Sequence, residues 1–131
     1  MPQKAIELIL MRQLADCLTL PILLFDQGGN LVFYNEPAEA LLGHRFDETG
    51  EITLEEWYTI FRVTAEDGSP VPLEDRPLII ALNKGRAAHR DYLLQTADGI
   101  TRRVGLTALP LDGQGTRYLG AAVVFWEAAE P

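Results

Sequence analysis

Few side chains in this sequence could perform chemistry, and none stands at a spacing typical of a catalytic centre. The histidines are His44 and His89, and the single cysteine is Cys17. The chain has no glycine-rich phosphate loop, no histidine and carboxylate pattern for a metal, and no serine in a nucleophile elbow. A single cysteine cannot form an internal disulfide, and we expect Cys17 to be a small buried side chain on a helix. These patterns favour a binding domain over an enzyme.

Two aspartates keep an enzyme open as an alternative function. Asp26 and Asp91 both lie in or next to predicted strands, where a side chain can point into an apolar interior. A small cone-shaped α+β enzyme, similar to ketosteroid isomerase, would need one protonatable carboxylate deep in such a pocket. Neither aspartate belongs to a recognisable motif, so we expect that the chain is not an enzyme.

Size and charge indicate one acidic domain. The chain has 131 residues, 47% of them hydrophobic, which is enough for one continuous core. Its 19 acidic and 11 basic residues give a net charge of −8, which repels the phosphates of nucleic acids and of anionic membranes. The N-terminus lacks the pattern of a signal peptide, and no segment is long and apolar enough to span a membrane. We expect a cytoplasmic protein that binds neither nucleic acid nor membranes directly.

The first predicted element is an apolar helix over residues 3–18. Its apolar side chains cover more than half of the helix circumference, whereas a helix on one core needs a stripe of roughly 100°. Either the helix is sandwiched inside the domain, or it lies on a sheet and also pairs with the same helix of a second subunit. We favour the second arrangement, with Ile6, Leu10, Leu14 and Leu18 at the dimer interface.

A β-hairpin and a short helix are predicted next. Residues 21–26 and 31–34 are short apolar runs joined by a turn that contains two glycines, as in a hairpin. Asn35 can cap a helix over residues 36–42, because its side-chain oxygen can accept a hydrogen bond from a free backbone N–H. Residues 44–75 show a weaker pattern, for which we expect short helical turns.

The remaining elements predict an α+β fold. Residues 76–84 are a better-marked helix, with a proline in the first turn and a glycine after the end. Strands are predicted over residues 90–95, 101–109 and 118–126, and the last is apolar on both faces, which is typical of a central, doubly covered strand. We expect a five-stranded antiparallel sheet with short helices on one face and the N-terminal helix on the other.

This order of elements, from about Leu20 to Glu130, resembles the PAS domains of bacterial sensor kinases. The resemblance rests on turn and cap residues in a characteristic order rather than on one motif. In the first half these are Ile22-Leu-Leu-Phe-Asp26, Gly29-Asn30-Leu-Val-Phe-Tyr-Asn35, Ala38 and Gly43. In the second half they are Asp67-Gly68-Ser-Pro-Val-Pro72, Arg76-Pro77-Leu78, Ala81-Leu82, Gly85, Asp98-Gly99, Arg103 and Gly120 to Phe125. The chain then divides into a dimerisation helix, residues 1–19, and a PAS domain, residues 20–131.

The resemblance to PAS domains implies a sensory role in signal transduction, such as in a two-component system. It implies a pocket between the helices and the sheet for a small ligand, a homodimer, and a partner such as a histidine kinase or a regulator. The candidate lining residues are Trp57, Phe61, Ile79, Leu82, Tyr92, Leu94, Val104 and Leu106. Alternatively, these side chains only fill the core, and the chain is a ligand-free protein-interaction and dimerisation module.

Two cofactors that PAS domains hold elsewhere are not expected in this chain. Haem needs an axial ligand, usually a histidine that faces the cavity, and the helix over residues 76–84 has none. We therefore expect His44 and His89 on loops or the surface. The photoactive flavin branch needs a cysteine between an asparagine and an arginine, and Cys17 lies far upstream of that position. A small organic ligand is the remaining expectation.

The end of the last strand departs from the PAS pattern. The family commonly has an aspartate, an aliphatic residue and a threonine there, which join the domain to a signalling helix. This chain has Glu127, Ala128 and Ala129 at these positions. We expect either a piece of a longer sensor or a free-standing domain that signals by contact with another molecule.

Overall fold

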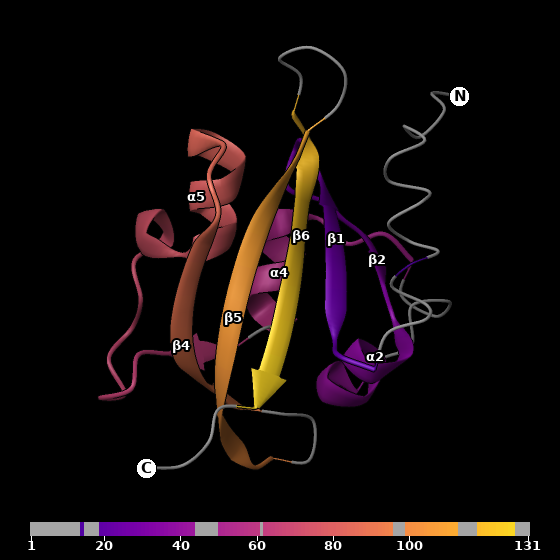
Figure 1. The fold of residues 1–131 in the computed structure, drawn as a ribbon. Helices are drawn as coiled ribbons and strands as arrows, with labels where there is room; N and C mark the ends of the chain where they lie inside the picture. The colour runs from indigo at the N-terminus through magenta and orange to yellow at the C-terminus, as the bar shows by residue number, and fades with distance from the viewer. Residues whose placement is uncertain are drawn as a thin grey trace.

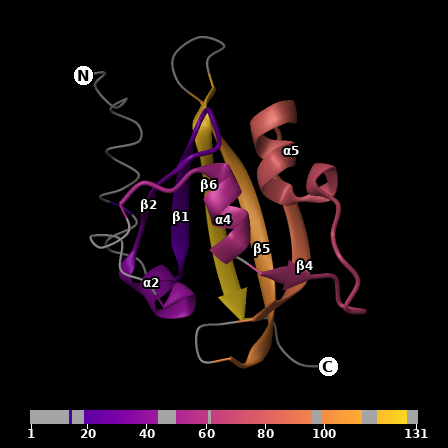
Figure 2. The same ribbon diagram turned by 180° about the vertical axis from the view of Figure 1, so that it is seen from behind.

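A computed structural model describes residues 14, 19–43, 50–60, 62–95, 99–112 and 118–127. Within these ranges the chain forms one antiparallel sheet, and helices cover one of its faces, as Figures 1 and 2 show from opposite sides. The elements are β1 (Ile22–Asp26), β2 (Leu31–Tyr34), α2 (Glu36–Leu42), α4 (Leu54–Ile60), β3 (Val63–Thr64), the 3-10 helix η1 (Leu73–Asp75), α5 (Pro77–Lys84), β4 (Ala88–Gln95), β5 (Thr101–Asp112) and β6 (Tyr118–Glu127).

The strands follow the order β2-β1-β6-β5-β4-β3, and every pair of neighbours is antiparallel. The two ends of the described chain therefore meet edge to edge, because β6 lies between β1 and β5. This confirms the predicted central strand and the α+β class. The predicted strand number was too low, because Val63 and Thr64 pair with Leu94 and Leu93 as a sixth strand. A strand of two residues is too short to show an alternating pattern in the sequence.

The local signals in the sequence explain the helices. The Asn35 side chain accepts a hydrogen bond from the backbone N–H of Ala38 and so caps α2, which ends at Gly43 in the left-handed conformation. Pro77 occupies the first turn of α5, where its missing N–H removes no hydrogen bond. In the described ranges, no helix is both long and apolar enough to cross a membrane.

Successive side chains of each strand lie on opposite faces of the sheet and so form two apolar layers. The inner face, under the helices, carries the main core, whose largest fully buried side chains include Tyr34, Tyr92, Phe25 and Phe125. A second cluster of buried apolar side chains lies on the outer face of β1, β2 and β6. Its members are Ile22, Leu24, Val32, Phe33 and Ala122. A register shift after Leu24 places both Val32 and Phe33 in this outer cluster.

The predicted N-terminal helix falls outside the described residues, as do three of its four expected interface residues, Ile6, Leu10 and Leu18. Leu14 is described, and 51% of its surface is exposed. The position of the helix, the dimer interface and the division into residues 1–19 and 20–131 therefore stay predictions.

Candidate functional site

The inner face of the sheet and the helices border a small, partly open cavity of about 20 Å³. This volume holds about one water molecule, so an organic ligand could enter only if the surrounding elements moved apart. The cavity lies between α4, the start of α5 and the inner face of the sheet. Figure 2 shows these helices in front of the sheet. It is lined by Phe25, Trp57, Tyr58, Val63, Arg76, Pro77, Leu78, Tyr92, Leu106 and Val123.

Three of the side chains expected to line a ligand pocket meet at this cavity, namely Trp57, Tyr92 and Leu106. Leu94 and Val104 are buried in the same core but do not border the cavity, and Leu82 packs against that core from α5. Ile79 is half-buried on α5, and Phe61 lies outside the described residues. Contact of any of them with a ligand stays a prediction.

Two tyrosine hydroxyls in the cavity wall have no hydrogen-bond partner among the described residues. They belong to Tyr58 on α4 and Tyr92 on β4, and both oxygen atoms are shielded from solvent. Only 1% of the Tyr92 surface is exposed. A buried polar group without a partner destabilises the folded protein, so each such group calls for an explanation.

Arg76 brings a positive charge to the same cavity. Its guanidinium carbon lies 4.7 Å from the centroid of the Tyr58 ring, and its Nε donates a hydrogen bond to the carbonyl oxygen of Val71 at 3.4 Å. Sequence patterns gave Arg76 only the role of a residue that begins a helix, and Tyr58 only a place in an apolar island. No spacing pattern in the sequence places Tyr58 and Arg76 at one cavity, because the cavity combines elements that are distant in the chain.

Burial holds the pKa of both tyrosines above its usual value. It raises the pKa of Tyr92 to about 12, against an opposing effect of Arg76 and Arg90. It also raises the pKa of Tyr58, where Arg76 again opposes the shift. The two hydroxyls therefore keep their protons at neutral pH and can donate hydrogen bonds to a guest in the cavity.

Replacing Tyr92 with phenylalanine is expected to raise the free energy of unfolding at pH 7 by up to about 1 kcal/mol, because an unpartnered hydroxyl leaves the core. The raised pKa of Tyr92 also predicts a loss of wild-type stability between pH 10 and 12. In that window the unfolded chain loses the phenolic proton and the folded chain keeps it. Tyr92 should contribute up to about 1.4 kcal/mol per pH unit to the slope of stability against pH, and this contribution is absent from the variant.

Urea unfolding of both proteins at pH 7 and from pH 10 to 12 measures these differences. If the phenylalanine variant were less stable at pH 7 by more than about 1 kcal/mol, the hydroxyl would have to be hydrogen-bonded in solution.

An open groove of about 360 Å³ adjoins the cavity beside β3. The two spaces share Tyr58, Val63 and Arg76 as wall residues. The other groove residues are Arg62, Thr64, Leu93, Gln95 and Thr101. The groove has the size of a small-molecule site.

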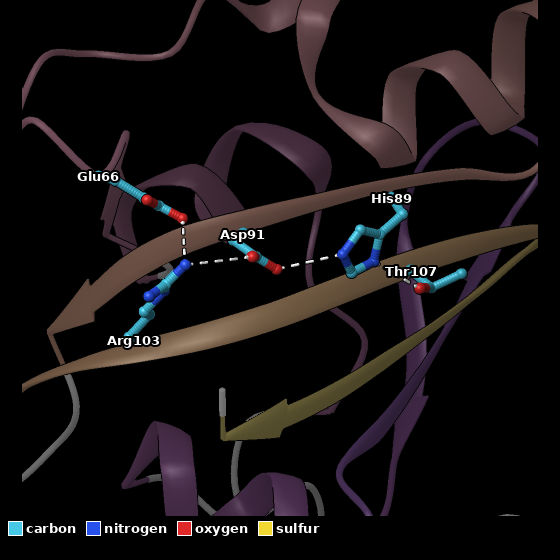
Figure 3. Close-up of polar contacts among 5 residues, drawn as sticks. All are labelled: Glu66, His89, Asp91, Arg103 and Thr107. Carbon is cyan, nitrogen blue, oxygen red and sulfur yellow. Dashed lines mark hydrogen bonds and ion pairs between the residues drawn. The ribbon is translucent and has the colours of Figure 1, made fainter. Parts of the chain in front are cut away.

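The outer face of β4 and β5 carries a chain of polar contacts, drawn in Figure 3. The Arg103 guanidinium lies 2.9 Å from Glu66 and 3.6 Å from Asp91. The ring nitrogens of His89 lie 3.1 Å from Oδ1 of Asp91 and 3.0 Å from Oγ1 of Thr107. Exposed pairs of this kind contribute little to stability, so their main effect is to order the side chains of this face.

Trp126 continues this face onto β6. Its indole ring lies across Gly105, where any Cβ would come within 2.6 Å of the ring, and stacks on His89 with centroids 5.3 Å apart. Trp126 is 37% exposed and Leu109 is 42% exposed. We call Leu109, Leu111, Val124 and Trp126 the outer patch. The outer side of β6 is therefore only partly buried at this end, and coverage of both its faces stays a prediction.

The residues considered for catalysis lie away from the cavity wall. Asp26 accepts hydrogen bonds from the backbone N–H groups of Gly28 and Asn30 in the first hairpin turn, and Asp91 faces outward beside His89. His89 is exposed on the outer face, and His44 and Cys17 lie outside the described residues. Where residues are described, no three His, Cys, Asp or Glu side chains are grouped to hold a metal.

The family comparison agrees with the fold. The family model described as "PAS domain" matches residues 10–81, more than half of the chain. The chain belongs to the PAS domain family. In PAS terms, the cavity lies between the helices and the inner face of the sheet, and the outer patch lies on the opposite face. No curated protein matches the sequence.

Solved structures of PAS and LOV proteins share this fold at low sequence identity. The PAS domain of Bordetella pertussis BvgS has a TM-score of 0.63 and 18% identity, over 95% of this chain and 87% of that one. The PAS domain of nitrogen regulation protein NR(II) from Vibrio parahaemolyticus has a TM-score of 0.63 and 18% identity, over 91% and 98%. The Rhodobacter sphaeroides LOV protein has a TM-score of 0.72 and 17% identity, over 95% and 69%. Such distant likeness establishes the fold alone.

Proposed function

We propose that this PAS domain is a sensor of a signal-transduction protein and that it binds a small organic ligand at the cavity between α4, α5 and the sheet. One observation carries the proposal. Two buried tyrosine hydroxyls line a cavity without a hydrogen-bond partner among the described residues, although ordinary cores satisfy such groups. Similar folds in a nitrogen regulation protein and a LOV protein support a regulatory role.

A ligand at this site would have to change the packing of the domain. The cavity of about 20 Å³ is smaller than an organic molecule, whereas the adjoining groove of about 360 Å³ is not. Binding would then favour a state in which α4 and the start of α5 lie farther from the sheet. A ligand shifts a conformational equilibrium only through its different affinities for the two states, and this expansion provides such a difference.

We further propose that the outer patch contacts a second copy of the chain and that the dimer acts on a kinase or regulator. Trp126 and Leu109 are large apolar side chains that remain exposed on an otherwise continuous apolar layer. Exposed apolar patches on sheets often mark protein interfaces, and tryptophan frequently contributes most of the binding energy.

Native mass spectrometry of freshly purified protein tests both parts of this proposal. We expect a dimer and a small additional mass per subunit that is lost on denaturation. Trp126→Ala should weaken the dimer at least tenfold because it removes the largest exposed apolar side chain of the outer patch, and it should leave the additional mass in place. Ile100→Ala is the matched control, because Ile100 is also an exposed apolar residue, at 52%, but lies outside the patch.

The outcomes separate the alternatives. A dimer without any bound mass, even from several expression hosts, would favour a ligand-free dimerisation module. A strict monomer at high micromolar concentration, with a bound mass, would contradict the proposed dimer and support the proposed ligand-binding sensor.

A further inference from the structure

The polar side chains at the cavity are two tyrosines and an arginine, and all three can donate hydrogen bonds. Tyr58 and Tyr92 each present a buried hydroxyl, and the guanidinium of Arg76 adds N–H groups that can only donate. The remaining wall residues of the cavity are apolar, and none of them is acidic. The lining therefore supplies three hydrogen-bond donors and no carboxylate to receive them.

Arg76 also lacks an ion-pair partner. Among the described residues no carboxylate oxygen lies within 4.0 Å of its guanidinium, and its one hydrogen bond goes to the carbonyl oxygen of Val71. Its charge is half-buried against the Tyr58 ring. A second arginine, Arg90, lies 5.9 Å from the centroid of the Tyr92 ring. Burial raises the pKa of Tyr92 and both arginines act to lower it, although Arg90 also interacts with Asp67. Two positive charges thus lie near the cavity, in a protein whose net charge is −8.

An acidic residue near this cluster does not neutralise it. Asp75 acts on Tyr92 electrostatically, but it is exposed at the end of η1 and does not line the cavity. Solvent screens an exposed charge more strongly than a half-buried one. The positive charge of Arg76 and the unpartnered hydroxyls therefore both favour a negatively charged ligand that accepts hydrogen bonds.

We propose that the cavity and groove select a small organic carboxylate, whose oxygens accept hydrogen bonds from Tyr58, Tyr92 and Arg76. This inference rests on the proposed ligand-binding function and adds the chemical class of the ligand. The carboxylate enters the cavity that Tyr58 and Tyr92 line, and the organic body lies in the adjoining groove, whose wall also includes Tyr58, Val63 and Arg76. A single water molecule in the cavity would satisfy the hydroxyls but not the charge of Arg76.

Matched pairs of an acid and its amide test this selectivity. Benzoate and benzamide have the same ring, as do phenylacetate and phenylacetamide, and each pair differs in charge. Binding is measured by titration of the ¹⁵N-labelled protein, with the amide signals of Val63, Leu78 and Tyr92 as reporters of the site and that of Thr107 on the outer face as the reference. We expect each acid to bind at least about tenfold more tightly than its amide, because hydrogen bonds to a charged group are the stronger ones.

Arg76→Gln should lower the affinity for the acids about tenfold or more and change that for the amides less than about twofold. Arg86→Gln is the charge-matched control, because Arg86 is exposed beyond the end of α5 and lines neither space. It should leave both affinities within about twofold of wild type. Tyr92→Phe should weaken the acids several-fold in the same assay.

Equal affinities for acid and amide would overturn the carboxylate inference and leave the ligand-binding function standing. No binding of either acid up to the millimolar range would also overturn it. In that case, a bound mass in native mass spectrometry would still support a ligand of another class, and an empty protein would count against the proposed function as well.

Discussion

Gly120→Ala is expected to be strongly destabilising, with a loss of about 4 kcal/mol in the free energy of unfolding. Gly120 lies in β6 with a φ of +147°, and its neighbours across the sheet are Asp26 of β1 and Leu111 of β5. A Cβ at this position would overlap the carbonyl oxygen of Phe25, a backbone atom of β1 that cannot turn away. Overpacking of about 1–3 kcal/mol and a strained backbone of similar size add together here.

The matched control for this substitution is Gly68→Ala. Gly68 also has a positive φ, of +86°, but no atom lies within 4 Å of the place that a Cβ would occupy, so the control isolates the backbone strain. A loss of about 1 kcal/mol is expected for the control. Urea unfolding followed by circular dichroism measures both variants. A loss below about 2 kcal/mol for Gly120→Ala would mean that β1 and β6 are less closely paired in solution.

Asn35→Ala is expected to cost about 3 kcal/mol, far more than the removal of an ordinary helix cap. Asn35 is 2% exposed, and its side chain forms hydrogen bonds with three backbone groups. Its oxygen accepts hydrogen bonds from the N–H groups of Ile22 and Ala38, and its nitrogen donates one to the carbonyl oxygen of Leu20 at 2.9 Å. The substitution therefore removes the cap of α2 and also leaves buried groups at the start of β1 unpaired.

Thr53→Ala provides the comparison, because Thr53 also caps a helix but does so at the surface. Among the described residues, its hydroxyl bonds with Glu56 in the first turn of α4, and both contacts are exposed. A loss of about 1 kcal/mol is expected there. Chemical unfolding of the two variants in parallel gives the difference. Equal losses would show that the bonds from Asn35 to β1 add nothing to stability.

Most of the fold could be predicted because its signals are local. Asn35, Pro77 and the glycines after α2 and α5 mark helix ends through backbone chemistry that needs no tertiary context. The alternation in residues 101–109 and the apolar run in residues 118–126 likewise identify the strands. The extensions of β4 to Ala88 and of β5 to Asp112 were missed, because pairing with a neighbouring strand, and not an apolar pattern, defines them.

The candidate site was harder to predict because it combines residues that are distant in sequence. Trp57, Tyr92 and Leu106 could be identified as apolar lining, but Tyr58 and Arg76 carry no local signal for a shared cavity. No sequence pattern predicts the contact between Trp126 and Gly105 either. It depends on the register of β5 against β6, which places a residue without a side chain beneath the indole ring.

The position of β6 has a consequence for how a bound molecule could be detected from outside. Val123 lines the cavity, while Val124 and Trp126 belong to the outer patch. Successive residues of one strand thus touch the interior and the exterior, so that a single thickness of backbone separates them. Any displacement of Val123 by a guest must be accommodated by the same chain segment that carries the indole ring, without a relay through loops or helices.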